Sequence, residues 1–253
     1  MSEIVVRKCQ GTDEFRLCVK LQQKVWSFSD AELVPLRMFV VADKVGGQVV
    51  GAFDGSELIG FALSVPGHRN GHSYLHSHMA AVDERYRNAG VGRKLKLFQR
   101  EEALSRKIEL MEWTFDPLEI KNAFFNIRRL GAIMRHYNIN QYGVTTSALH
   151  GGLPTDRLIA EWWLRSKRVT RLLEERVDPQ FDVVKRVSVP GEIYAWKAAS
   201  ETRDQAAEVQ SRNREEFRHA FAEGLSVLGY ERDDLGNGTF LLGRWDEDWS
   251  YAK

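Results

Sequence analysis

Arg87-Asn88-Ala89-Gly90-Val91-Gly92 joins a predicted strand at residues 74–82 to a predicted amphipathic helix at residues 92–106. Glycine adopts backbone angles that are closed to other residues and lets a ligand approach the main chain. The N–H groups of such a loop can therefore converge on an anion at the positive end of the following helix. This stretch predicts a site for a pyrophosphate group.

Two familiar phosphate-binding loops do not match these residues. A Walker loop requires GxxxxGK[ST], and a Rossmann fingerprint requires GxGxxG with an acidic residue about twenty positions later. Gly90, Gly92 and the Arg93-Lys94 pair satisfy neither pattern. What remains is RxxGxG at a junction between a strand and a helix.

The hydrophobic periodicity of the preceding and following segments predicts alternating strands and helices. In order, these are strand 4–8, a helix capped by Thr12 or Asp13, a helix within 30–42, strands 49–53 and 58–65 around an Asp54-Gly55-Ser56 turn, strand 74–82, helix 92–106, strand 109–115, helix 118–130, strand 133–142 and strand 156–164.

The RxxGxG loop and this order of elements resemble the GNAT acyltransferase superfamily, whose pyrophosphate loop is Q/R-x-x-G-x-G/A after the fourth strand. The resemblance implies an α/β fold with a mixed, mostly antiparallel sheet flanked by helices. It also implies acetyl-CoA, or another short acyl-CoA, as the co-substrate. Asp116-Pro117-Leu118, with residues 122–131, is similar to a subgroup of predicted GNAT acetyltransferases with a long C-terminal extension.

The predicted domains are a GNAT core at residues 1–165 and a smaller α+β lobe at 166–253. The order of elements in the lobe is similar to that of the first quarter of the chain, so one interpretation is a degenerate half-repeat. No second RxxGxG occurs there, and we expect no second cofactor site. We expect the lobe to close the acceptor pocket, so that truncation after Arg165 would spare CoA binding.

Charge and cysteine content narrow the functional classes. The 36 basic and 35 acidic side chains give a net charge of +1, so no overall field favours a nucleic acid or an anionic membrane. Cys9 and Cys18 have no CxxC or His/Cys spacing, so we expect free buried thiols, no disulfide and no metal site. The absence of an apolar signal core or long apolar run predicts a cytoplasmic protein.

The resemblance assigns cofactor-binding roles by position. Ala81 and Val82 would present backbone groups to the pantetheine arm, where the fourth strand splays from its neighbour to admit the thioester. Residues 87–92 would supply the pyrophosphate donors. The individual candidates for cofactor binding are therefore Ala81, Val82, Arg87, Asn88, Ala89, Gly90, Val91, Gly92, Arg93 and Asn126.

Acetyl transfer to an amine requires a base, because the attacking nitrogen must be neutral. Period-two alternation places Tyr74, His76, His78 and Ala80 on one face of the fourth strand. His76 is the first candidate base, since its ordinary pKa lies near operating pH, and His78 is the second. A hydrogen-bonded structural histidine is the alternative for both.

Two carboxylates of the fifth strand are further candidates. Glu112 is either an inward carboxylate, whose pKa burial would raise into the range of a base, or a polar residue on a solvated face. Asp116 at the strand end is either a binding group for a substrate ammonium or a turn residue.

One position departs from the family pattern. Many GNAT enzymes have a tyrosine four residues before the glycine that ends the next helix, and it protonates the departing thiolate. Counting back from Gly131 gives Ile127, which has no proton to donate. Either Tyr137, Tyr142 or a water protonates the thiolate instead, or the transfer proceeds without a dedicated acid.

These features together predict a GNAT-family N-acyltransferase that transfers an acetyl or short acyl group directly to a small-molecule amine or amino-acid-like acceptor. The alternative is a non-catalytic acyl-CoA sensor or protein-interaction module on the same fold. We expect a monomer or homodimer, with neither nucleic acid nor membrane as a partner.

Overall fold

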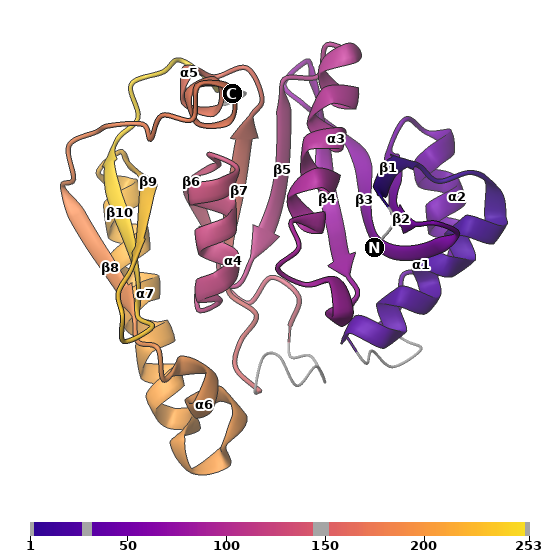
Figure 1. The fold of residues 1–253 in the computed structure, drawn as a ribbon. Coiled ribbons are helices and arrows are strands. Elements are labelled where there is room, and N and C mark those ends of the chain that lie inside the picture. The colour runs from indigo at the N-terminus through magenta and orange to yellow at the C-terminus, as the bar shows by residue number, and fades with distance from the viewer. Residues whose placement is uncertain (1–2, 27–31, 144–151, 251–253) are drawn as a thin grey trace. The chain divides into compact units, whose positions relative to one another are not determined.

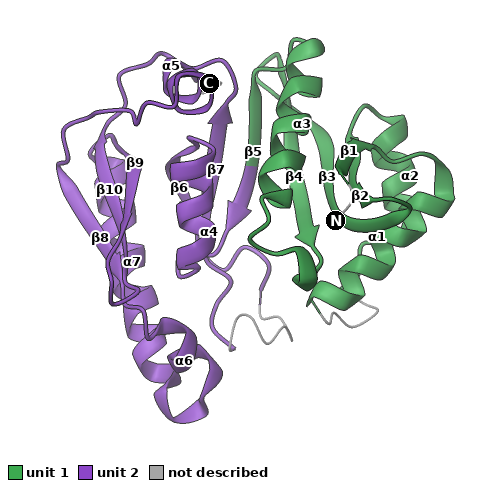
Figure 2. Ribbon diagram, in the orientation of Figure 1, with its two compact units in different colours: residues 1–112, 251–253 green, residues 113–250 purple. Residues whose placement is uncertain are grey.

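The computed structural model describes residues 3–26, 32–143 and 152–250, which form two compact units (Figure 2). The first unit contains the described residues up to Glu112, and the second contains Trp113–Ser250. The predicted domain boundary at residue 165 lies inside the second unit and stays a prediction.

The first unit contains strands in the order β1-β2-β3-β4 and the first half of β5, as far as Glu112 (Figure 1). The strands are β1 (Ile4–Lys8), β2 (Gln48–Asp54), β3 (Glu57–Arg69), β4 (His72–Val82) and β5 (Leu110–Phe115). Neighbours are antiparallel as far as β4, whereas β4 and β5 are parallel. This mixed, mostly antiparallel sheet is the one predicted.

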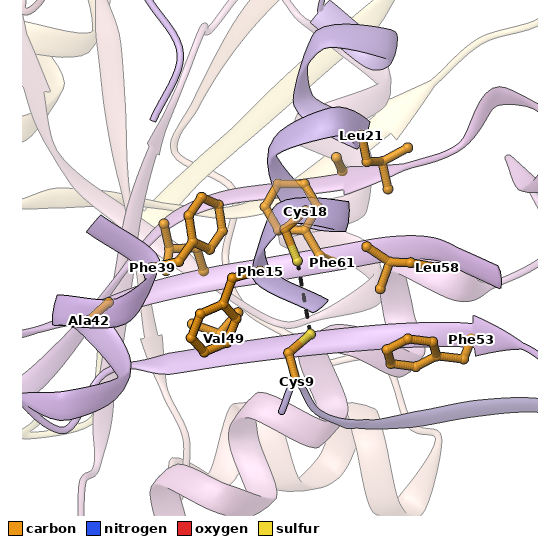
Figure 3. Close-up of a cluster of buried hydrophobic side chains, with 12 residues drawn as sticks. Cys9, Phe15, Cys18, Leu21, Phe39, Ala42, Val49, Phe53, Leu58 and Phe61 are labelled. Atoms are coloured by element: carbon orange, nitrogen blue, oxygen red, sulfur yellow. Dashed lines mark hydrogen bonds between the residues drawn. The ribbon is translucent and has the colours of Figure 1, made fainter. Parts of the chain in front are cut away.

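Helices cover both faces of this sheet and create two separate apolar cores. They are α1 (Gly11–Trp26), α2 (Leu36–Lys44), the short η1 (Glu84–Tyr86) and α3 (Val91–Ser105). Side chains of α1 and α2 pack with one face of the sheet, as Figure 3 shows for Phe15, Phe39 and Phe61. Val91 and Leu95 of α3 pack with the other face. Cys9 and Cys18 are free, buried thiols in the first core, with sulfurs 3.9 Å apart (Figure 3).

The start of α1 differs slightly from the prediction. The helix begins at Gly11, before the predicted caps Thr12 and Asp13. A carboxylate oxygen of Glu14 accepts a hydrogen bond from the backbone N–H of Gln10 at 2.6 Å. The first turn is therefore closed by a side chain that reaches back, as in a capping box.

Two tight hairpins set the register of β2, β3 and β4. The predicted turn after Asp54 is confirmed, with Gly55 at φ 61°. A second turn has Asn70 at φ 51° and Gly71 at φ 82°, the left-handed angles that a two-residue Asn-Gly hairpin requires. Because this turn is so short, β3 and β4 extend further than predicted, and β3 continues to Arg69.

A β-bulge in β4 changes which side chains share a face. Leu63 of β3 pairs with Met79 and the next residue of β3 pairs with Ser77, so His78 is the extra residue. Met79 packs against the α1–α2 core and Val82 against the α3 core, which places Ala80 on the α3 side. The predicted common face of Tyr74, His76, His78 and Ala80 is therefore wrong for Ala80, because a bulge shifts the alternation by one residue.

The second unit has a sheet in the order β7-β6-β9-β10-β8 (Figure 1). Its elements are α4 (Ile120–Phe124), the π-helical turn η2 (Phe125–Arg129), β6 (Ile133–Asn138), β7 (Arg157–Trp163), α5 (Lys167–Thr170), the π-helical turn η4 (Arg171–Glu175), β8 (Lys185–Val189), α6 (Ile193–Ala198), η5 (Ser200–Thr202), α7 (Arg203–Ala222), β9 (Leu225–Arg232) and β10 (Gly238–Arg244).

The proposed half-repeat has the predicted element order but a different pairing. β8 pairs with β10, the third strand of its group, whereas β1 pairs with β2. The lobe is also continuous with the rest of its unit, because Met134 of β6 pairs with Val227 of β9. Among the helices within the described ranges, none combines the length and apolar character that a membrane span requires.

Candidate active site

The phosphate loop begins from a fixed point at the end of β4. Asp83 accepts hydrogen bonds from the backbone N–H of Arg85 at 3.1 Å and from Lys24 Nζ at 2.6 Å. The Arg85 guanidinium also bonds to this carboxylate, and together these donors hold the pKa of Asp83 far below its ordinary value. The loop is therefore anchored to α1 by a carboxylate that stays charged.

The loop itself is shaped by two left-handed residues and is open to solvent. Asn88 has φ 65° and Gly90 has φ 77°. Gly90 caps α3 without any side-chain hydrogen bond, and the first helical bond runs from Lys94 N to Gly90 O. The N–H groups of Val91, Gly92 and Arg93 are the ones that a helix start leaves unpaired, so they are available to an anion.

The residues around this cradle leave space for a ligand. A Cβ placed on Gly90 would meet no atom within 4 Å. Four of the predicted binding residues are exposed before the helix, and one more on its first turn: Arg87, Asn88, Ala89, Gly90 and Arg93. The structure thus brings the predicted pyrophosphate residues together at one solvent-facing helix start.

β5 pairs with only part of the adjacent edge of β4. The parallel ladder between these strands consists of the pairs Leu75–Met111 and His76–Glu112. No described strand pairs with this edge from Ser77 to Val82. Ala81 turns its side chain into the α1–α2 core, so its contribution to a ligand is its backbone. A free strand edge of this kind can accept an extended chain with amide groups.

His76 lies where this ladder ends. Its ring centroid is 6.2 Å from that of His78, in the bulge, and its strand partner is Glu112. Burial, together with the nearby charges of His78, Lys96 and Arg69, lowers the pKa of His76 to about 4. The imidazole is therefore neutral at physiological pH, and its lowered pKa makes it a weaker base than an ordinary histidine. Desolvation also lowers the pKa of His78, although its side chain is exposed.

Glu112 is buried, with 6% of its surface exposed, and it forms a salt bridge with Arg69. Arg69 donates to both carboxylate oxygens, with Nη1–Oε2 at 3.1 Å and Nη2–Oε1 at 2.8 Å. The guanidinium also lies 4.8 Å from the ring centroid of Tyr74, and that ring occupies the space beside Gly67. Both oxygens of Glu112 are therefore engaged in charge-assisted hydrogen bonds.

Sequence reasoning missed three residues of this neighbourhood. The Asn70-Gly71 hairpin extends β3 as far as Arg69 and so brings this residue close to Glu112. The Asn-Gly pair in the sequence could have predicted that extension. Lys96 and Ser77 form a buried contact, with Nζ 2.7 Å from Oγ. A lysine on the apolar stripe of a predicted helix was the available signal for that contact.

The second unit holds the remaining candidates. Asn126 lies in the π-helical turn η2, and its buried Nδ2 has no hydrogen-bond partner among the described residues. Ile127 is buried and apolar. The hydroxyl of Tyr137 donates to Asp156 at 2.7 Å, and burial raises the pKa of Tyr137 above its ordinary value. Tyr142 is half exposed, with its hydroxyl 3.0 Å from that of Thr114.

Asp116 has an internal ammonium partner. Lys197 of α6 lies 3.0 Å from Asp116 and 2.9 Å from Glu119, and it is 5% exposed. Asp116 also accepts from the N–H of Leu118 at 2.8 Å. The turn role is therefore observed, and the site that a substrate ammonium would use is taken by Lys197.

Residues 15–131 match the sequence model of the Acetyltransferase (GNAT) family. Residues 15–131 therefore form a domain of the GNAT family. The fold of the chain is similar to that of the ribosomal-protein-S18-alanine N-acetyltransferase from Escherichia coli, with a TM-score of 0.52 and 15% identity over 65% of this chain and 96% of the other. No curated protein matches it.

Two further solved structures show the same fold. An N-acetyltransferase from Staphylococcus aureus Mu50 has a TM-score of 0.54 and 11% identity, covering 65% of this chain and all of its own, 100%. The structure of yncA from Salmonella typhimurium with its cofactor acetyl-CoA has a TM-score of 0.53 and 15% identity over 65% of this chain and 96% of the other. The predicted fold is confirmed. The match to the acetyltransferase family supports acetyl-CoA or CoA as the co-substrate and acyl transfer as the reaction class.

Proposed function

We propose that the chain transfers the acetyl group of acetyl-CoA directly to the amine of a small molecule or amino-acid-like acceptor. The observation that carries this proposal is an open helix start at Gly90 without a side-chain cap, which follows β4 and η1. No described strand pairs with the edge of β4 from Ser77 to Val82. The first can hold a pyrophosphate and the second an extended amide chain. Both are features that one acyl-CoA molecule would use together.

The cofactor roles follow from these two surfaces. Residues 87–92 and Arg93 bind the pyrophosphate, mainly through backbone N–H groups, and Ala81 and Val82 bind the pantetheine arm through their backbone. Asn126 lies in the second unit, and its role in cofactor binding stays a prediction from the resemblance.

His76 is the base in this proposal. Its imidazole is neutral at physiological pH and lies at the residue where the β4–β5 ladder ends. Glu112 is a less suitable base because Arg69 engages both of its oxygens. It acts instead as the charged neighbour that holds Arg69 beside His76. His78, the bulge residue two positions after His76, is the alternative base.

The second candidate is an acyl-CoA-binding module without turnover. Ile127 favours it, because a buried isoleucine replaces the proton-donating tyrosine of many family members. Such a protein would use the same loop and strand edge and would need neither His76 nor an acceptor.

The release of free thiol from acetyl-CoA over a panel of amines and amino acids tests the proposal. We expect release that depends on both the amine and His76. Tight CoA binding with no thiol release for any amine, including peptide N-termini, would favour the binding module. The full chain is required, because β9 pairs with β6 and Lys197 neutralises Asp116. The truncation after Arg165 would remove both, so it cannot isolate the role of the lobe.

A further inference from the structure

A lysine and a serine form a buried polar pair beneath α3. Lys96 Nζ donates to Ser77 Oγ at 2.7 Å, and the two residues are 5% and 4% exposed. Ser77 follows His76 directly, so it is the first residue of β4 beyond the ladder with β5. The pair therefore sits where the free strand edge begins.

The distance along β4 suits an extended cofactor arm. Val82 lies five positions after Ser77, which is about 17 Å along a strand at ~3.3 Å per residue. Val82 leads into the phosphate loop, and Ser77 lies at the other end of the free edge. If the pyrophosphate is bound at Gly90, an arm that follows this edge brings its thioester end toward Ser77.

The charge state of Lys96 suits proton donation. Burial lowers its pKa to about 7, which makes its ammonium a much stronger acid than an ordinary lysine. His76 on β4 lies close enough for the charge of Lys96 to help lower its pKa.

The same face of α3 has further hydrogen-bonding capacity. Gln99 lies one turn after Lys96, is fully buried, and neither polar atom of its side-chain amide has a partner among the described residues. Ser64, the strand partner of Ser77, donates to Gln48 at 3.0 Å. A water bound beside Gln99 would satisfy its amide and connect this polar layer.

We propose that Lys96, acting through the hydroxyl of Ser77, donates the proton that the departing CoA thiolate takes up. This inference rests on the proposed function and supplies the acid that Ile127 cannot provide. His76 removes a proton from the acceptor ammonium, and the amine forms a C–N bond with the acetyl carbonyl. When the C–S bond breaks, sulfur takes the Ser77 hydroxyl proton and Ser77 takes one from Lys96. The new amide nitrogen loses its second proton to solvent, which also takes the proton from His76 and restores the Lys96 ammonium.

The test measures ionisation of the thiol of bound CoA, through the ultraviolet absorbance of the thiolate as a function of pH. The complex with desulfo-CoA gives the baseline. In the wild-type protein we expect the bound thiol to ionise about one pH unit or more below free CoA, because a cationic lysine stabilises a nearby thiolate. Lys96→Met should return it to the free value, and Ser77→Ala should reduce the shift. The matched control Ser64→Ala removes a buried hydroxyl from the neighbouring strand and should leave the shift intact.

Turnover provides a second readout. Lys96→Met and Ser77→Ala should each lower kcat by about 10²- to 10⁴-fold, and the double variant should be no slower than the slower single variant. Wild-type kcat should fall as pH rises through about 7, where Lys96 loses its proton, and this alkaline limb should be absent in Lys96→Met.

The possible failures are distinguishable. If CoA does not bind the wild-type protein, the proposed function and this inference both fall. If CoA binds but its thiol ionises as in solution, or the shift persists in folded Lys96→Met, only the inference falls. If Lys96→Met does not fold, lysine NMR of the wild-type protein decides. The neutral-range lysine titration should move to higher pH when CoA replaces desulfo-CoA, and an unchanged midpoint would overturn the inference.

Discussion

The phosphate loop and the His76 cluster lie in the same unit but are built from different atoms. The loop from Arg87 to Gly92 is exposed and offers mainly backbone N–H groups at a helix start. The cluster around His76, formed with Arg69, Ser77, His78, Lys96 and Glu112, offers side chains, and burial and neighbouring charges lower the pKa of His76. Cofactor binding should therefore depend on backbone shape, whereas turnover should depend on charge and protonation.

Replacement of His76 should show most clearly that turnover and cofactor binding depend on different regions. His76→Ala should lower kcat/KM by about 10²- to 10⁴-fold because the acceptor ammonium keeps its proton. Acetyl-CoA affinity should be unchanged, since the loop and strand edge are intact. Steady-state kinetics with a calorimetric titration check this. Near-normal turnover would transfer the role of base to His78 or Glu112.

A glycine substitution should produce the opposite separation. Gly90→Ala places a Cβ in the cradle at φ 77°, and we expect acetyl-CoA affinity to fall by about 10- to 100-fold, or 1.4–2.7 kcal/mol. The matched control is Gly55→Ala in the β2–β3 turn, which has φ 61° and equally open space. Both variants should lose similar stability. Equal affinities in the two variants would show that the loop does not bind the cofactor.

The protonation of His76 should also appear in the stability of the protein. Its pKa of about 4 lies below the ordinary value of 6.5, so between these values the unfolded chain binds more protons than the native one. The free energy of unfolding should therefore fall as pH drops from 6.5 to 4, with His76 contributing about 1–3 kcal/mol. Denaturant titrations of the wild type and His76→Gln at several pH values measure this share. Identical slopes would contradict the pKa.

The smallest expected effect comes from the Arg69–Glu112 pair. Arg69→Met leaves a buried carboxylate without its cation, but Arg69 itself is 42% exposed, so solvent limits the loss to about 1–2 kcal/mol. Arg7→Met is a matched control, because Arg7 also binds a carboxylate bidentately and lies 4.0 Å from a ring centroid, that of Phe53. Only Arg69→Met should raise the pKa of His76 and so move the acid limb of kcat/KM upward. An unmoved limb would exclude electrostatic coupling between Arg69 and His76.

These regions also differ in how far the sequence could predict them. The loop depends on two left-handed positions and one helix start, which are local and leave a signal in the RxxGxG pattern. The elements of the core were predicted for the same reason, because each follows from local periodicity.

The His76 cluster depends on register between strands, which the alternation of one strand does not contain. The bulge at His78 moved Ala80 to the other face. The Asn70-Gly71 turn brought Arg69 to Glu112, and the tertiary contact of α3 with β4 brought Lys96 to Ser77. The domain boundary at residue 165 stays a prediction, and the pairing of β9 with β6 is a contact that local periodicity did not indicate.

The central claim is that Gly90 and the free edge of β4 form one acyl-CoA site, and a calorimetric titration of acetyl-CoA into the full-length protein tests it most directly. We expect one molecule to bind with a Kd in the low micromolar range or tighter. A Kd of ~1 μM corresponds to a binding free energy of about −8 kcal/mol. At a hundredfold excess over Kd the ligand should stabilise the fold by about 2.7 kcal/mol in a thermal melt. Absence of binding heat, together with a melt unchanged by millimolar CoA, would contradict the account.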